Sequence, residues 1–243
     1  MNTLSNEMTI GEMVAEDYRA ASVFGKHDID FCCKGHRTLV EVCERKGVSM
    51  EEIKRELEEI LRDPSDNSID FKSWPLDLLT SYIEKTHHRY VEQQIPVLLQ
   101  FLEKLCKVHG ARHQELFEIY DLFRFSAGDL TQHMKKEELI LFPFINKMVL
   151  AEKNNVSIDM PNFGSVENPI EMMKVEHTTE GERFATIATL TDGFTPPEDA
   201  CTTYRVTFQM LKEFEQDLHR HIHLENNILF PKAIALQKQF QLD

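Results

Sequence analysis

Residues that interrupt helices and positive charges are both scarce in this sequence. Only nine of its 243 residues are glycine and nine are proline, which leaves room for long uninterrupted helices. Lysine and arginine number 27 against 41 for aspartate and glutamate, so the formal net charge is −14. A chain this acidic lacks the positive surface with which proteins bind nucleic acid or anionic membranes. No apolar run approaches the about 20 residues of a membrane-spanning helix, so we expect neither nucleic acid nor a membrane among its partners.

The sequence also lacks the cysteine pattern of a disulfide-stapled protein. Its five cysteines are an odd number in a chain of this length, which fits a reducing compartment. The N-terminus has neither the basic start nor the apolar core of a secretory signal. We therefore predict a cytoplasmic protein. Cys43, Cys106 and Cys201 are expected to be packing residues, because a buried free cysteine is an ordinary small hydrophobic side chain.

The first sixty residues carry the pattern of short helices. Apolar residues at helical spacing predict a helix over 9–24, and Ser49 with Glu52 forms a capping box that begins another. The segment 63–68 has turn residues and no apolar side chain, so we interpret it as a linker. It separates a small N-terminal helical domain from a larger domain.

The boundary at this linker gives domains of residues 1–68 and 69–243. The second domain contains four long helical patterns, over 75–108, 112–150, 169–190 and 195–240. The second pattern should be interrupted near 126–128, where serine, alanine and glycine follow each other. No alternation typical of strands is present. Four long helices with mostly short connections predict an all-α fold, an antiparallel four-helix bundle.

One motif, His-x-x-x-Glu-x-x-Ile-Leu-Phe-Pro, occurs twice, 88 residues apart. The first copy contains His133 and Glu137, and the second contains His221 and Glu225. Residues four apart on a helix face the same way, about 6 Å apart along the axis. Each pair can therefore hold one metal ion, and imidazole with carboxylate suits iron, zinc or manganese. The repeat suggests two helical hairpins that each supply half of one site.

The first helix of each hairpin should supply one further ligand. His87 lies as far before Gly110 as His133 lies after it, so a turn at this glycine would bring the two histidines level. His177 precedes the second copy of the motif by nearly the same interval. Four histidines and two glutamates are too many for one tetrahedral zinc and match two irons with both carboxylates between them. Ferritin-type proteins use more carboxylates, so this nitrogen-rich set points to hemerythrin-like chemistry.

The histidines of such a site also need partners for their second ring nitrogen. Four residues lie within helical reach: Tyr82, Glu84, Tyr90 and Glu176. Glu138 should face elsewhere, because one residue turns the helix by about 100°. His219 and His223 are expected to be exposed, since they lie about 160° from His221. His109 and His113 flank the turn and are expected to be helix-end or solvent residues.

Two further segments complete a family pattern. The stretch Asp30-Phe-Cys-Cys-Lys-Gly35, the stretch Ala200-Cys-Thr-Thr203 and the two metal motifs closely resemble the bacterial iron–sulfur cluster repair family, the RIC proteins (repair of iron centres). The resemblance covers nearly the whole chain. It implies an ScdA-like N-terminal domain and a hemerythrin-like bundle with a non-haem, oxo- or hydroxo-bridged di-iron centre. It also implies a cytoplasmic protein, often a homodimer, that helps to restore clusters damaged by nitric oxide or peroxide, by delivering iron.

The resemblance also implies which residues act. By the family motif the two irons are held by His87, His133, Glu137, His177, His221 and Glu225. His88 is the alternative to His87, which we prefer for its spacing about Gly110. The adjacent Cys32 and Cys33 match the family as well, which implies a redox or iron-handling role. From the residues alone, packing is the commoner role of such cysteines.

Three functional classes remain open. The first is an iron donor that acts on damaged iron–sulfur proteins or on the cluster assembly machinery, and the cysteine-containing N-terminal domain favours it. The second is an enzyme that reduces nitric oxide or peroxide at the same di-iron site. The third is an oxygen-binding or sensing module, as in ordinary hemerythrins. Nitric oxide or oxygen is the expected small ligand.

Overall fold

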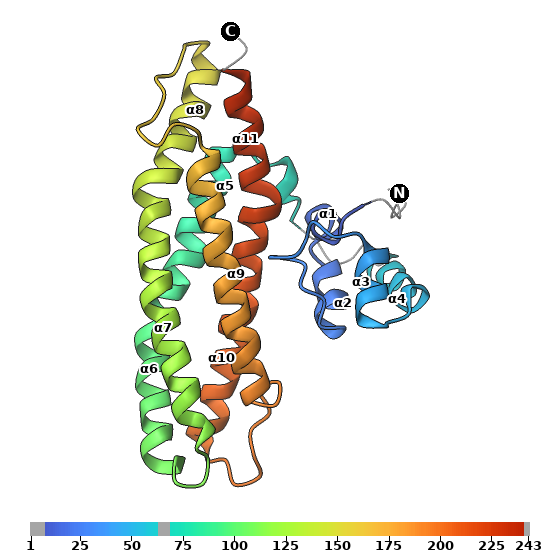
Figure 1. Ribbon diagram of the computed structural model, residues 1–243, viewed down its shortest axis with the longest axis vertical. Helices are drawn as coiled ribbons and strands as arrows, with labels where there is room; N and C mark the ends of the chain where they lie inside the picture. The colour runs from blue at the N-terminus through green and yellow to red at the C-terminus, as the bar shows by residue number, and fades with distance from the viewer. Residues whose placement is uncertain (1–7, 63–68, 241–243) are drawn as a thin grey trace.

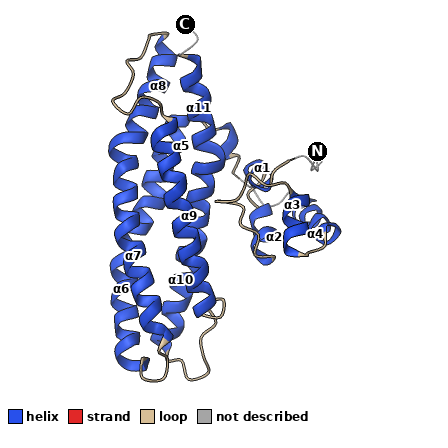
Figure 2. Ribbon diagram, viewed as in Figure 1, coloured by secondary structure: helices blue, strands red, loops and turns tan. Residues whose placement is uncertain are grey.

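The computed structural model describes residues 8–62 and 69–240 of the chain (Figure 1). Every regular element within these two ranges is a helix, as Figure 2 shows, and the all-α prediction is confirmed. The expected linker 63–68 lies outside the described residues. None of the described helices has both the length and the apolar composition needed to cross a membrane.

The N-terminal part contains four short helices: α1 (Ile10–Glu16), α2 (Ala20–Lys26), α3 (Leu39–Lys46) and α4 (Met50–Arg62). Capping boxes begin α1 and α3, and the Glu52 N–H donates to the Ser49 hydroxyl ahead of α4 at 3.3 Å. The single helix expected over 9–24 is wrong. Asp17 has extended backbone after α1, with φ −150°, so the chain turns before α2.

Four long helices form the second part, and each except the third contains a π-helical segment. A short 3₁₀ turn, η1 (Phe71–Ser73), precedes them. The first long helix consists of α5 (Leu76–Tyr82), η2 (Ile83–His88) and α6 (Arg89–His109), and the second consists of α7 (Glu115–Lys136), η3 (Glu137–Leu141) and α8 (Phe142–Asn154). The third is α9 (Glu167–Leu190), and the fourth consists of α10 (Thr202–Leu224), η4 (Glu225–Leu229) and α11 (Phe230–Gln239). Figure 1 shows them running alternately up and down, which is the predicted antiparallel bundle.

The irregular positions within these helices differ from the prediction. Helix α7 runs unbroken through 126–128, where an interruption was expected, and the irregularity falls instead at η3. The fourth helix begins at Thr202 and not near 195. Pro143 follows η3 and Pro231 follows η4 at the start of the next α-helical segment. A proline ring crowds the carbonyl four residues back and offers no N–H, and a wider π turn accommodates both.

Apolar side chains fill the bundle above and below one polar level. Leu102 and Phe123 belong to the cluster toward the α6–α7 turn, and Leu79 and Ile145 belong to the cluster at the other end. Along the helices, the histidine and glutamate residues of the repeated motif fall between these clusters. The apolar packing thus fixes the helices on both sides of the polar residues.

Candidate metal centre

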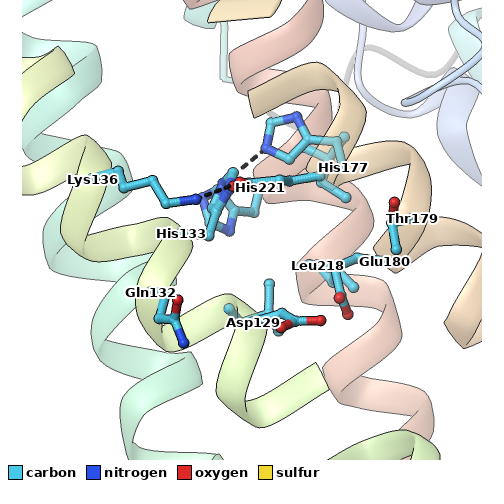
Figure 3. A pocket seen from close by; sticks show the side chains of 12 residues that line it. Asp129, Gln132, His133, Lys136, His177, Thr179, Glu180, Leu218 and His221 are labelled. Carbon is cyan, nitrogen blue, oxygen red and sulfur yellow. Dashed lines mark hydrogen bonds and ion pairs between the residues drawn. The ribbon is translucent and has the colours of Figure 1, made fainter. Parts of the chain in front are cut away.

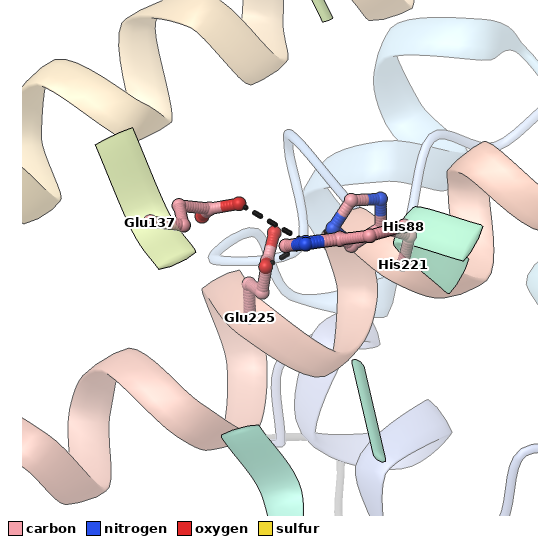
Figure 4. Close-up of side chains that lie close together, drawn as sticks. All are labelled: His88, Glu137, His221 and Glu225. Atoms are coloured by element: carbon pink, nitrogen blue, oxygen red, sulfur yellow. Dashed lines mark hydrogen bonds and ion pairs between the residues drawn. The ribbon is translucent and has the colours of Figure 1, made fainter. Parts of the chain in front are cut away.

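Two groups of metal-binding side chains meet inside the bundle. One contains His88, Glu137, His221 and Glu225, and the other contains His133, Glu137, His177 and Glu225. Within each group the possible ligand atoms all lie within 4.8 Å of one another. All six side chains are buried. Figure 4 shows the first group, with both glutamates directed toward the imidazoles. The two glutamates are shared by both groups, as carboxylates between two metal ions would be.

The distances within the groups are those between ligands of a common ion. Glu137 Oε2 lies 3.3 Å from His88 Nε2 and 3.4 Å from His133 Nε2. Glu225 places one oxygen 3.1 Å from His177 Nε2 and the other 3.1 Å from His221 Nε2. Two ligands about 2.1 Å from one metal ion lie about 3 Å apart. Each glutamate therefore joins one histidine of each group.

Several of these buried atoms have no hydrogen-bond partner among the described residues. They include both carboxylate oxygens of Glu137, Oε2 of Glu225 and Nε2 of His88. An unpaired polar atom removed from water costs free energy, and a charged one costs more. Cations bound between the two helical hairpins would satisfy these atoms. The residues present therefore fit a pair of metal ions, and imidazole with carboxylate suits iron.

The pKa values of Glu137 and Glu225 also indicate that this site would be stabilised by positive charge. Burial, together with the nearby charge of Glu225, raises the pKa of Glu137 to about 7. Burial opposes ionisation of Glu225 as well, but the imidazoles of His221 and His177 hold its pKa well below the usual value. Burial lowers the pKa of His177, yet its contacts with the carboxylates outweigh this and raise it to about 9. Two carboxylates sharing a dry site repel each other, and bound cations would remove that conflict.

The position of His88 differs from our preference for His87. His87 belongs to neither group: its Nδ1 donates to Asp217 at 2.9 Å, and its ring stacks on His221 at 5.7 Å. The equal spacing about Gly110 assumed a regular α-helix. The π-helical turn of η2 ends at this position and changes the register by about one residue. The structure therefore brings His88, and not His87, to the shared glutamates.

Outer carboxylates and an amide orient three of the imidazoles. His133 donates from Nδ1 to Glu176 at 2.8 Å, and His88 donates to Glu138 at 3.0 Å. His177 donates to the Asn226 side-chain oxygen at 2.9 Å. Such partners fix the ring so that Nε2 faces the shared glutamates. Of the four residues predicted for this role, Glu176 takes it. The contact to His133 chiefly lowers the pKa of Glu176, to about 2.

Glu138 and Asn226 were missed by sequence reasoning. Glu138 does face away from the shared glutamates, as predicted, but that direction leads to the outer nitrogen of His88 on another helix. Contacts between helices of this kind leave no periodic signal. Asn226 follows Glu225 directly, and only its position within the motif, which Glu138 holds in the first copy, could have drawn notice.

A cavity of about 260 Å³ lies beside the second group. Figure 3 shows His133, His177 and His221 lining it, together with Lys136 and Glu180. A volume of this size holds a few water-sized molecules. A small diatomic ligand can therefore be accommodated next to three of the imidazoles.

The cysteine loop docks on the bundle of its own chain. Cys33 Sγ donates to the His177 carbonyl at 3.3 Å, and the Asn226 amide donates to the Cys32 carbonyl at 3.2 Å. The two sulfurs are 3.8 Å apart. The neighbouring Cys33 and burial raise the pKa of the Cys32 thiol well above its usual value. Gly181 permits the approach, because a Cβ there would lie 3.1 Å from Cys33 Sγ.

His223 was expected to be exposed, and this prediction is wrong because the N-terminal part docks on the bundle. Its side chain is 1% exposed, covered by Phe31 and Tyr18 at ring distances of 5.8 and 5.9 Å. Its Nδ1 accepts from the Asn227 amide at 3.0 Å. His219, also expected outside, is half-buried beside Phe31 at 6.3 Å. The segments before and after α2, which contain Tyr18 and Phe31, cover the face of α10 that a bare bundle would expose.

Fold and site together define a hemerythrin-like helical bundle preceded by a cysteine-containing domain. Residues 80–233 match the hemerythrin HHE cation binding domain, and residues 6–61 match ScdA_N, a domain of unknown function (DUF542). The iron–sulfur cluster repair protein YtfE of Pectobacterium carotovorum subsp. carotovorum (strain PC1) is 33% identical over 228 residues, 94% of this chain and 97% of the relative. The protein of that name from Yersinia pestis (strain Pestoides F) is 33% identical over 226 residues, 93% and 96% of the two chains. The chain belongs to this family of iron–sulfur cluster repair proteins, as the motifs predicted.

Proposed function

We propose that this chain is a non-haem di-iron protein that helps to repair iron–sulfur clusters damaged by nitrosative or oxidative stress, as an iron donor. The observation that carries the proposal is the pair of buried groups that share Glu137 and Glu225. The name of the relatives, iron–sulfur cluster repair protein, supports the repair role. Damaged iron–sulfur proteins or the cluster assembly machinery are the proposed partners.

In this proposal His88 and His221 hold one iron, His133 and His177 hold the other, and the two glutamates lie between them. Bound irons would supply a redox-active centre with positions left for nitric oxide or oxygen. The outer carboxylates and Asn226 keep each Nε2 directed inward. Neutral imidazoles and carboxylates hold iron less firmly than a thiolate cage, which suits a donor. Iron release should increase as pH falls, because protonated histidines no longer bind metal.

Cys32 and Cys33 have a redox or iron-handling role in this proposal. Cys33 contacts the backbone of His177, and Asp30 lies within ligand distance of both sulfurs. A site made by these three residues would stand directly beside the iron centre.

The first test is iron analysis of the full chain, with absorption and Mössbauer spectra. We expect about two irons per chain and loss of at least half of them in His88→Ala and in His133→Ala. His87→Ala should retain more iron than His88→Ala, because His87 is outside both groups. His36→Ala is the matched control, since its side chain is exposed and belongs to neither group. Fewer than one metal in freshly reduced wild type, or equal loss in the control, contradicts the proposal.

A second candidate function is reduction of nitric oxide or peroxide at the same centre. The cavity beside His133, His177 and His221 favours it, because it offers space for a small substrate. Turnover with a defined reductant distinguishes the two functions: an enzyme consumes many equivalents per chain, whereas a donor loses its iron once.

We further propose a homodimer that acts in the cytoplasm. The five free thiols fit a reducing compartment. Light scattering on the purified chain measures the oligomeric state directly, and a monomer at every accessible concentration would contradict the dimer.

The domain boundary after residue 68 stays a prediction, testable by expressing residues 69–243 alone and measuring helicity and iron content.

A further inference from the structure

A second cluster of reactive side chains lies at the end of the bundle remote from the metal groups, where α6 ends and α10 begins (Figure 1). His109 is the last residue of α6, and Cys201 is the N-cap of α10. Their side chains meet, with His109 Nε2 3.2 Å from Cys201 Sγ. None of the roles described above uses this pair.

The environment differs from that of a packing cysteine, so our expectation for Cys201 is wrong. Cys201 is exposed, whereas His109 is only 7% exposed. The Nδ1 atom of His109 has no hydrogen-bond partner among the described residues, and the ring is held edge-on by Tyr204 at 5.3 Å. The buried imidazole is therefore fixed in place with its Nε2 directed at the sulfur of an exposed residue.

We propose that Cys201 is a modification site: a nucleophilic thiol that forms a mixed disulfide with low-molecular-weight disulfides of the glutathione class, with His109 as its base. A thiol beside an imidazole at the N-terminus of a helix is the common setting of reactive cysteines. The helix that begins here, α10, is 23 residues long and has no side-chain cap. Because the residue is exposed, the bulky adduct can extend into solvent.

The step balances as a thiol–disulfide exchange. The proton of the Cys201 thiol passes to His109 Nε2, and the thiolate attacks one sulfur of the small disulfide. The bond between the two small-molecule sulfurs breaks, and its electron pair leaves with the second sulfur. That thiolate takes up the proton from the imidazolium. Cys201 is oxidised to the mixed disulfide, and half of the small disulfide is reduced to a free thiol.

The other four cysteines lack this combination. Cys106 is half-buried and donates to the Leu116 carbonyl at 3.3 Å, and Cys32 and Cys43 are buried. Cys33 contacts a backbone carbonyl and not an imidazole ring. The prediction is therefore specific to one residue of the five.

The test measures mixed disulfide formation at Cys201 with oxidised glutathione, at constant pH, by peptide mass spectrometry after an acid quench. The iron-loaded full chain is compared with the same chain unfolded in urea. We expect the native residue to react about tenfold faster than the unfolded one, because the imidazole contact exists only in the fold. Equal or slower reaction in the native chain overturns the proposal, since exposure alone cannot exceed that of an unfolded chain.

Two variants locate the cause. His109→Gln should lower the native rate at Cys201 toward the unfolded rate, with helicity checked by circular dichroism. Cys106→Ser is the matched control and should leave the rate at Cys201 unchanged. If the native rate is raised but His109→Gln retains it in a folded protein, His109 is not the base and the proposal fails. The experiment measures the reactivity of a thiol at the end of the bundle remote from the metal groups. A negative result would therefore not contradict the proposed function.

Discussion

At the scale of single residues, two identical motif positions behave differently. Glu137 and Glu225 are both fully buried, yet the pKa of Glu137 is raised and that of Glu225 is lowered. Glu225 lies 3.1 Å from two imidazole nitrogens, whereas Glu137 is slightly further from its own pair and has no hydrogen-bond partner. The two carboxyl groups should therefore respond in opposite ways to removal of their charge.

The first prediction concerns Glu137→Gln in the iron-free protein. The pKa of Glu137 rises from 4.5 to about 7 on folding, so wild type loses stability as pH rises through this window. The variant avoids this loss, and we expect its Tm at pH 8 to exceed that of wild type by several degrees. Iron content should nevertheless fall. Glu225→Gln is the opposing control and should lower the Tm. A lower Tm in both variants would contradict the argument.

Sequence could predict five of the six residues in the two groups. Four of them follow because a His and a Glu four apart must share a helix face, and His177 follows from its interval to the second motif. It could not decide between His87 and His88, since that choice depends on a π turn. The outer partners Glu138 and Asn226 escaped because they come from neighbouring helices, and only tertiary packing sets such contacts.

At the scale of elements, the π-helical segments mark the positions of the shared glutamates. Glu137 begins η3 and Glu225 begins η4, and each segment is followed by Phe-Pro. Sequence reasoning placed the interruption of the second helix at 126–128 instead. It overrated Gly128, because one glycine costs a helix only about 1 kcal/mol, and the buried Ser126 hydroxyl is bonded to Glu180 within the bundle.

The second prediction concerns Pro143→Ala. Alanine restores a backbone N–H and removes the ring, so the π turn at η3 is no longer required. We expect unchanged or higher thermal stability of the iron-free protein, with iron removed by a chelator about three times faster or more. Pro96→Ala is the matched control, because Pro96 also lies inside a helix but away from both groups. Identical iron loss in the two variants would show that the π turn does not position Glu137.

At the scale of the whole molecule, the N-terminal helices and the bundle form one packed body. Residues of both parts share one apolar cluster, which includes Ile10 and Phe24 with Phe123 and Phe214. The sequence predicted two domains but not their contact, because the cysteine loop of the N-terminal domain presents backbone carbonyls, of Phe31 and Cys32, to Asn227 and Asn226 of the bundle. Backbone contacts of this kind have no residue signature.

The third prediction tests this contact with Gly35→Ala. A Cβ at Gly35 would collide with the Phe31 carbonyl and crowd the Asn227 side chain, so the loop must shift. We expect the Tm to fall by several degrees and Cys33 to be alkylated faster. Gly25→Ala is the control in the same domain: nothing lies within 4 Å of its Cβ position, and alanine should stabilise α2 by about 0.5–1 kcal/mol. Equal effects would mean that Gly35 makes no close approach.

The fourth prediction concerns the groove between the N-terminal helices and α10. Burial, opposed by Lys212 and aided by Asp28, raises the pKa of Glu215 to about 7. The ionised form is therefore disfavoured by folding, and stability is lost as pH rises from about 4.5 to about 7. Glu215→Gln should stabilise the protein at pH 8 by on the order of 2 kcal/mol, with no difference near pH 4. Urea unfolding at both pH values measures this, and a difference independent of pH would refute it.

The side chain of Asn226 holds the imidazole of His177 with its oxygen and the Cys32 carbonyl with its nitrogen. One side-chain amide thus contacts both a candidate iron ligand and the cysteine loop. Because the oxygen and nitrogen of this amide turn together, rotation of the Asn226 side chain would disturb both contacts. The orientation of the His177 ring and the position of the cysteine loop are therefore coupled through one side chain.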